Sequence, residues 1–376
     1  MTNRTRLLGV VDQAVSSVTN VAITVVAARA LEPKAFGGFA LAFAFYLALI
    51  GLARALATEP LLIRGGGDGG GPNQLRAPTG AMAALGVAAG AFCVVAGLVA
   101  GGVAGRPLLV GAAFLPLLFT QDGLRYGAFA SGRPTHALAI DLVWLAVQGP
   151  GVALLAATDA RDPAAYMAVW GAAGSISAVV GALWARVLPS LRAGVQWIRA
   201  NRDLGGPFVV EFLAAGGATY AGLWLLGLVS GLAAVGAVRV AQTIFGPINV
   251  LYAGIYLTLV PEGARHARDD LARVSMSMRR ASAVLLVTAA LATVAALAIP
   301  DGAGRSLFGG TWAAARPVLL PMGLTLCGSA VMAGALAGLR SLAAARLTLR
   351  TRVATIPLTL AAPVIGAFAA DEVGFA

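Results

Sequence analysis

The stretch RPLLVGAAFLPLLFTQDGLRYGAFASGRP, residues 106–134, combines two properties that rarely occur together. It contains an apolar run long enough for a helix to cross the hydrocarbon core of a bilayer, which takes about 20 residues. Near its centre stand Gln121, Asp122, Arg125 and Tyr126. Ionisable groups in a membrane span are costly and usually face the interior of a helix bundle or a water-filled cavity. The stretch therefore predicts a membrane helix with one polar, inward-facing side.

The composition of the whole chain indicates a polytopic membrane protein. Of its 376 residues, 59% are hydrophobic and 11% are charged, and the mean hydropathy is +0.84. A soluble domain cannot bury that much apolar surface. The two cysteines, Cys93 and Cys327, lie in apolar runs and are interpreted as packing residues. With only two histidines in the chain, no metal site is predicted.

Apolar runs of about 18–25 residues are candidates for membrane spans. The chain contains eleven such runs, at approximately 7–28, 37–58, 79–102, 108–131, 136–157, 164–188, 207–230, 234–260, 281–300, 316–339 and 353–370. Polar residues interrupt the first run at Asp12, Gln13 and Asn20, so it is interpreted as a span and not as a signal peptide. The predicted fold class is therefore an all-α polytopic membrane protein.

The basic residues of the chain follow the spans and do not form one soluble patch. The net charge of +11 would be compatible with nucleic-acid binding, but most arginines fall between apolar runs. With the N-terminus placed in the cytoplasm, eighteen arginines lie on the inside and seven basic residues on the outside. The positive-inside rule then predicts a multi-pass protein of the plasma (cytoplasmic) membrane with a cytoplasmic N-terminus, and no nucleic-acid partner.

A weak internal repeat suggests two halves. AFASGRP (128–134) follows the fourth span, and ALAGLRS (335–341) follows the tenth, at an offset of roughly 200 residues. Six spans per unit would give both halves the same orientation, as in parallel-repeat transporters. We therefore expect an N-terminal six-helix bundle at 1–188, a cytoplasmic amphipathic linker at 189–206 and a C-terminal bundle at 207–376. The linker sequence SLRAGVQWIRANRDLGG suits either a helix at the headgroups or a solvated connection.

Polar residues inside the spans are the candidate functional residues. In the first span Gln13, Ser17, Asn20 and Thr24 share one helix face, which favours either a hydrated cavity or hydrogen bonds between helices. In the fourth span Asp122 and Arg125, three residues apart, are expected to form an internal ion pair. Such a pair could present the guanidinium to a phosphate, or could simply lock the helix to its neighbours.

Four further ionisable residues have a simpler interpretation. Arg54 could face a cavity or extend its side chain to the headgroups, and Arg239 is in a similar position near the outer end of the eighth span. Asp141 and Glu211 lie close to the starts of predicted helices, where an acid complements the helix dipole, so both are expected to have a capping or interfacial role. No Walker A motif and no catalytic constellation is present, so the chain is not predicted to be an enzyme.

Several motifs, taken in order, resemble a known family. ARALEPKAFG (28–37) joins a polar first span to the second, and QDGLRYGAFASGRPTHALAIDLVW (121–144) covers the fourth and fifth. VGAVRVAQTIFGPINVLYAGIYLTLVPEGAR (235–265) and LFGGTWAAARPVLLPMGL (307–324) cover the eighth span and the connection to the tenth. Together they resemble the oligosaccharide flippases of the multidrug/oligosaccharidyl-lipid/polysaccharide exporter superfamily. The chain departs from the twelve or more spans of that family, because only eleven are found and its tail AADEVGFA follows the last.

The resemblance implies two helical bundles around a central cavity that opens alternately to the two sides of the membrane. It implies flipping of a polyprenyl-diphosphate-linked oligosaccharide for cell-surface polysaccharide biosynthesis, with membrane lipid, a polysaccharide polymerase and glycosyltransferases as partners. Cavity arginines of the family often meet the diphosphate of the cargo. The residues proposed to line the cavity here are Arg54, Arg125, Arg239, Tyr126, Gln13 and Asn20.

Three points stay open at this level. Asp12 or Asp122 could couple transport to H⁺ or Na⁺ if either is unpaired, and no other cofactor is implied. The first alternative function is a multidrug or cation antiporter of the same superfamily, which would favour unpaired acids in the cavity. The second is a membrane scaffold of a polysaccharide-export complex that does not transport.

Overall fold

The computed structural model describes residues 3–64, 72–266, 271–341 and 373. Within these ranges the chain is helical and contains no strand, which confirms the predicted all-α class. The elements, in chain order, are α1 (Asn3–Ala30), α2 (Pro33–Ala53), η1 (Arg54–Thr58), α3 (Glu59–Arg64), α4 (Pro72–Ala100), α5 (Gly102–Ala130), α6 (Pro134–Ala157), α7 (Pro163–Ala185), α8 (Leu191–Ala200), α9 (Arg202–Phe212), η2 (Leu213–Gly217), α10 (Ala218–Val229), α11 (Leu232–His266), α12 (Leu271–Leu297), α13 (Asp301–Phe308), η3 (Gly309–Thr311) and α14 (Trp312–Ser341).

Ten of the eleven predicted spans coincide with described helices. Eight stretches of the described residues are long and apolar enough to cross a membrane, and two shorter apolar helical segments, Thr219–Val229 and Leu232–Ile248, fall in the seventh and eighth predicted spans. The second span is longer than predicted, because α2, η1 and α3 continue one another from Pro33 to Arg64. The eleventh predicted span, at 353–370, lies outside the described residues, as does the tail sequence except for residue 373. The chain is thus a multi-pass membrane protein.

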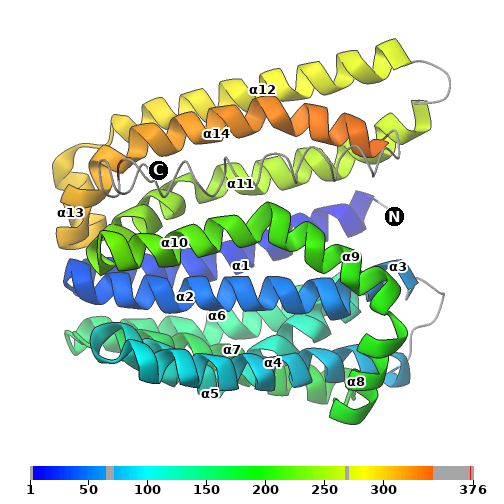
Figure 1. Cartoon of the computed structure of the whole chain (residues 1–376), viewed down its shortest axis with the longest axis horizontal. Helices are drawn as coiled ribbons and strands as arrows, with labels where there is room; N and C mark the ends of the chain where they lie inside the picture. Colours follow the sequence, from blue (N-terminus) through cyan, green and yellow to red (C-terminus); the bar gives the residue numbers. More distant parts are fainter. Residues whose placement is uncertain (1–2, 65–71, 267–270, 342–372, 374–376) are drawn as a thin grey trace.

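The helices run nearly parallel and form two groups (Figure 1). Helices α4, α5, α6 and α7 pack together on one side, and α11, α12 and α14 pack together on the other. Helices α1, α2 and α10 lie between them: α1 and α2 contact α6 and α5 in the first group, and both also contact α11 in the second. The exact domain limits at residues 188 and 207 stay a prediction.

Helix α2 is held in this central position by small residues and stacked aromatic rings. A Cβ on Gly37 would lie only 1.7 Å from the carbonyl oxygen of Leu232, and one on Gly38 would lie 2.5 Å from that of Val103. The backbone of α2 therefore touches the starts of both α11 and α5, as small residues allow in membrane helices. Farther along α2, the ring of Phe45 stacks on Trp224 of α10 at a centroid distance of 4.3 Å.

Replacing Gly37 by alanine is expected to destabilise the protein. The added methyl would overlap the Leu232 carbonyl, and overpacking of this kind costs about 1–3 kcal/mol. The matched control is Gly149→Ala in α6, because no heavy atom lies within 4 Å of a Cβ at that position. Thermal unfolding in detergent should show a lower midpoint for the first variant and an unchanged or higher midpoint for the second. Equal midpoints would contradict this helix contact.

The amphipathic linker contains α8, which lies across the starting end of α4 (Figure 1). The Ser190 hydroxyl caps the helix by accepting a hydrogen bond from the backbone N–H of Ala193, and Trp197 Nε1 donates to the carbonyl of Ala57 at 3.1 Å. Gly194 meets the backbone of Gly80 at a distance that leaves no space for a side chain. Apolar and basic side chains both remain exposed on α8, as expected for a helix at the headgroups. They are Leu191, Arg192, Val195 and Arg199.

An ion pair between Arg64 and Asp203 joins the C-terminal end of α3 to the start of α9. Arg64 donates hydrogen bonds to the side chains of Asn201, at 2.7 Å, and Asp203. The bond from Arg64 lowers the pKa of the Asp203 carboxyl below its ordinary value. The contact ties the linker region to the end of the second span.

Candidate functional site

Charged side chains from four membrane helices meet where the first group of helices packs against α1 and α2. One face of α5 supplies Gln121, Asp122 and Arg125, all of which are buried. Helix α1 supplies Asp12, α6 supplies Asp141, and Arg54 comes from the junction of α2 and η1. Burial of so many polar groups in a membrane requires that they pair with one another. We call Asp12, Arg54, Gln121, Asp122, Arg125 and Asp141 the buried network.

Arg125 holds two carboxylates from two other helices. Its Nε and Nη2 atoms both donate to Asp12 Oδ2, the former at 3.0 Å. Its Nε also lies 3.1 Å from Asp141 Oδ2. The second oxygen of Asp141 accepts a hydrogen bond from Gln121 Nε2 at 2.9 Å. The Asp12 side chain is fully buried and that of Asp141 is 4% exposed, so Arg125 links α1, α5 and α6 in a nearly dry environment.

Arg54 forms a two-pronged pair with Asp122. Its Nε donates to Asp122 Oδ2 at 2.9 Å and its Nη2 to Asp122 Oδ1 at 2.7 Å. The guanidinium also lies 5.3 Å from the centroid of the Tyr126 ring. The wider π-helical turn η1 begins at Arg54, and such turns occur frequently at functional sites. The pair joins α2 to α5.

The structure corrects three sequence-based predictions. The predicted internal ion pair between Asp122 and Arg125 is wrong, because each residue pairs with a side chain of a different helix. Residues three apart on a helix share a face but diverge by about 60°, so each side chain reaches its own neighbour. Arg54 does not extend to the headgroups, since Asp122 binds it. Nor are Asp141 and Glu211 caps: Asp141 is buried two turns into α6, and Glu211 lies at the C-terminal end of α9.

The buried network contains three carboxylates and two guanidinium groups. Fully ionised, it therefore carries one excess negative charge. Asp12 Oδ1 and Asp141 Oδ2 are buried and accept no hydrogen bond from the described residues. A cavity of about 10 Å³ beside Asp141, lined also by Ser16, Thr19, Asn20 and Trp144, is large enough for about one water molecule. The network can thus take up one proton, which would neutralise it.

Arg239 lies apart from this network, between the two groups of helices. It belongs to α11, and its guanidinium lies 4.4 Å from the centroid of the Phe43 ring of α2. Its Nη2 is 3.5 Å from Thr24 Oγ1 of α1, and its Nε is buried without a hydrogen-bond partner. Among the described residues it forms no ion pair, unlike Arg54 and Arg125. A cavity of about 10 Å³ beside it is lined by α2, α10 and α11, including Tyr220 and Gln242.

Two of the three remaining predicted cavity residues border the buried network, and the third lies farther along α1. Gln13 is exposed and accepts a 3.4 Å hydrogen bond from Arg125, and Tyr126 lies beside Arg54, so both border the buried network. Asn20 lies farther along α1, where its side chain accepts a hydrogen bond from Trp170 Nε1 at 3.2 Å. The structure therefore brings Arg54, Arg125, Tyr126 and Gln13 together with Asp12, and it leaves Arg239 separate.

Sequence reasoning missed the polar face of α6. Gln148 is 1% exposed and its Nε2 donates to the backbone carbonyl of Thr19 at 2.7 Å, which fixes α6 against α1. Asp141 and Gln148 are seven residues apart and so share a helix face after two turns. That seven-residue spacing, in a span with few other polar residues, could have predicted the polar face of α6 from the sequence.

Comparisons with known proteins identify the fold. No family model matches the chain, and no curated protein matches it. A solved structure described as the inward-facing conformation of a multidrug resistance MATE family transporter of the MOP superfamily has a TM-score of 0.66 at 13% identity, covering 96% of this chain and 89% of that one. The outward-facing conformation described in the same words has a TM-score of 0.59 at 13% identity, with 99% and 89% covered.

A third structure is described as a MOP superfamily transporter from Pyrococcus furiosus whose binding pocket has reverse polarity, suggesting a different function. It has a TM-score of 0.56 at 13% identity and covers 99% of this chain and 88% of that one. At this identity the matches show that the chain has the two-bundle fold of these transporters. They confirm the predicted architecture and leave the cargo to be argued from the residues.

Proposed function

We propose that this chain is a membrane transporter that works by alternating access and moves an amphipathic cargo with an anionic head. The observation that carries the proposal is Arg239, a guanidinium between the two bundles that has no carboxylate partner among the described residues. Arg54 and Arg125 are already neutralised by the carboxylates of the buried network. The available positive charge therefore lies at the interface that alternating access would open.

An unpaired guanidinium that is partly buried between membrane helices is costly, so its presence favours a ligand that supplies the missing charge. The planar fork of arginine matches the geometry of phosphate oxygens, and charge-assisted bonds of this kind are the strong ones. A polyprenyl-diphosphate-linked oligosaccharide presents such a head together with a lipid tail that stays in the membrane. We accordingly propose flipping of this class of lipid in the plasma membrane as the function.

The cavity beside Arg239 is far smaller than such a head in this conformation. Cargo binding therefore requires the bundles to separate along α2, α10 and α11. The solved structures of this fold have been described in both inward-facing and outward-facing conformations, which supports a motion of this kind. Rigid-body motion of one bundle against the other is the general way in which two-bundle transporters expose a central site.

We further propose that protons drive the cycle through the buried network. Its one excess carboxylate lies on Asp12 or Asp141, since these two share Arg125, whereas Asp122 is fully engaged by Arg54. Of the two acids suggested by the sequence, Asp12 is thus the better candidate for ion coupling. Taking up a proton would weaken the hold of Arg125 on α1 or α6 and so change how these helices pack.

The main alternative is export of a cationic drug, which is favoured by the multidrug transporters among the structural matches and by the excess negative charge of the buried network. Transport assays with the purified chain in vesicles discriminate between the two. A fluorescent polyprenyl-diphosphate sugar should become accessible in the opposite leaflet, faster under a proton gradient than under a sodium gradient. A lipophilic fluorescent cation should not be moved. The reverse result for the two cargos would reject our proposal in favour of drug export, and no movement of either would favour the scaffold.

A further inference from the structure

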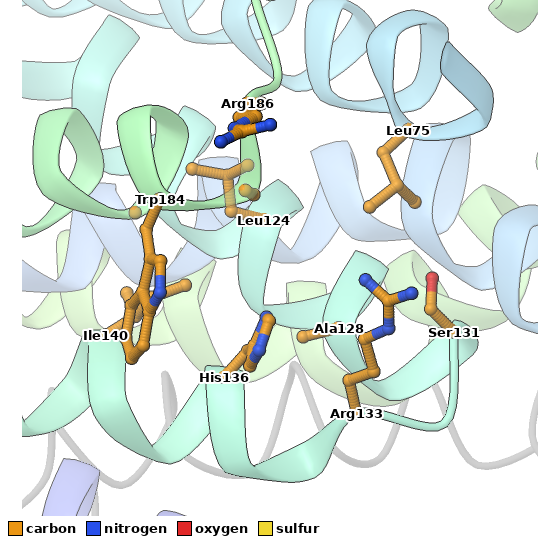
Figure 2. Close-up of a pocket in the computed structure, with 11 residues that line it drawn as sticks. Leu75, Leu124, Ala128, Ser131, Arg133, His136, Ile140, Trp184 and Arg186 are labelled. Carbon is orange, nitrogen blue, oxygen red and sulfur yellow. The ribbon is translucent and has the colours of Figure 1, made fainter. Parts of the chain in front are cut away.

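A third cavity, separate from those beside the buried network and Arg239, lies at the end of the first helix group (Figure 2). It has a volume of about 200 Å³. Its walls come from the start of α4, the turn between α5 and α6, and the last turn of α7. This is the end of the molecule at which α1 begins and α8 lies (Figure 1). Neither the proposed transport route nor the proposed coupling site uses it.

Two arginines and one histidine surround this cavity. Figure 2 shows Arg133 and His136 on one side and Arg186 across from them. Neither arginine forms an ion pair within the described part of the chain, and no acid is among the residues that line the cavity. The cavity is thus a concentration of positive charge without a protein counter-charge. An anionic group would complement it.

Apart from Ser131, the rest of the lining is apolar and adjoins an exposed apolar surface. Leu75, Leu124 and Ile140 form the inner wall. The Trp184 ring, which is 55% exposed, stacks on His136 at a centroid distance of 5.2 Å. Exposed leucines on either side of it extend this apolar surface, Leu183 at 71% and Leu188 at 76% exposure. Tryptophan is enriched where membrane helices reach the headgroups, so the cavity lies at the level of the membrane interface.

We propose that this cavity binds the phosphate head of an anionic phospholipid of the surrounding membrane. Arg133, His136 and Arg186 would contact the phosphate, and an acyl chain would follow the exposed leucines at the end of α7 and just beyond it, Leu183 and Leu188. Basic pockets between membrane helices bind lipid headgroups in this way. The cavity is smaller than the roughly 300–1,000 Å³ of sites for drug-sized ligands, so it suits a headgroup and excludes a glycan cargo. The lipid would tie the α5–α6 turn to the end of α7.

A free phosphate would satisfy the same three side chains but would gain nothing from the apolar wall. Binding to the purified chain in neutral detergent separates the two sources. Native mass spectrometry would measure it with phosphatidylglycerol, phosphatidylcholine and glycerol 3-phosphate as probes. We expect phosphatidylglycerol to bind, phosphatidylcholine to bind weakly, and glycerol 3-phosphate to fail to displace the bound lipid at equal concentration.

The double variant Arg133→Gln, Arg186→Gln should weaken phosphatidylglycerol binding by roughly tenfold to thirtyfold, from the usual contribution of two interfacial arginines. The control is Arg192→Gln, Arg199→Gln, which removes the same charge from exposed positions of α8 outside the cavity and should leave binding unchanged. Ala185→Phe fills the cavity without changing charge and should also weaken binding, which keeps the test valid if the double variant folds poorly.

Two results would overturn the proposal. Equal loss of binding in the α8 control would mean that net charge alone attracts the lipid. Displacement of the lipid by glycerol 3-phosphate at equal concentration would mean that the site binds free phosphate. Both readouts are independent of transport, so they stand whatever the cargo between the bundles proves to be.

Discussion

Replacing Arg125 by methionine is expected to destabilise the protein more than any other single change in the first bundle. The substitution would leave Asp12 and Asp141 buried side by side without a cation. Breaking a buried ion pair from one side costs about 3–5 kcal/mol, because the remaining charge is stranded. The free energy of unfolding, measured by denaturant titration in detergent, should fall by about this amount.

Two further measurements identify the cause of that loss. Lowering the pH should restore part of the stability of Arg125→Met, because protons would neutralise the stranded carboxylates. The triple variant Arg125→Met, Asp12→Asn, Asp141→Asn should recover most of it, since replacing a whole buried ionic cluster by neutral groups is often nearly neutral. Full stability in the single variant would show that Arg125 does not hold the two acids.

An exposed ion pair provides the matched control. Arg161 and Asp159 pair in the connection between α6 and α7, and both side chains are more than half exposed. Replacing Arg161 by glutamine should change stability little, because pairs in contact with solvent contribute about 0–1 kcal/mol. The hydrogen bond that Arg161 donates to Asp159 raises the pKa of the Arg161 guanidinium, so this side chain stays charged throughout the titration.

The sequence could predict which residues of α5 are polar and inward-facing, but not which residues of other helices they pair with. The polar face of α5 was predictable, because the positions of Gln121, Asp122 and Arg125 in an apolar run are local information. Their partners were not, since Arg54 and Asp12 are separated from them by 68 and 113 residues along the chain. The intrahelical pair was the only one that spacing within a single helix could propose. Choosing between it and pairs across helices requires knowing which helices are neighbours.

The same limit applies to the fold and to the interface between bundles. Ten spans follow from apolar run lengths, and the surface position of α8 follows from its mixed apolar and basic residues. The continuation of the second span through η1 to Arg64 did not follow, because a π-helical turn has no simple pattern. Arg239 was a candidate from its position near the outer end of a predicted span and from the family resemblance. Its lack of a carboxylate partner is a property of the packed helices, and it is the property that distinguishes it.

Replacing Arg239 by glutamine is expected to abolish most transport while making the protein more stable. The charge it removes is partly buried beside Phe43 without a described carboxylate, and its Nε has no hydrogen-bond partner, so its loss relieves a desolvation cost. A charge-assisted hydrogen bond to an anionic head contributes about 1.5–3 kcal/mol, so flipping of a polyprenyl-diphosphate sugar in vesicles should slow by roughly tenfold to a hundredfold at low cargo concentration. Loss of function with gain of stability is the signature of a binding residue.

Lysine at position 239 separates charge from geometry. Arg239→Lys keeps the positive charge but loses the two-pronged contact with phosphate oxygens, so transport should fall between that of the wild type and the glutamine variant. Arg305→Gln, at an exposed position in α13, is the control that changes net charge equally and should transport normally. If Arg239→Gln flips the lipid at the wild-type rate, the anionic-cargo proposal fails. If it instead gains export of a lipophilic cation, the arginine was excluding cations, and drug transport becomes the function that the remaining acids of the first bundle support.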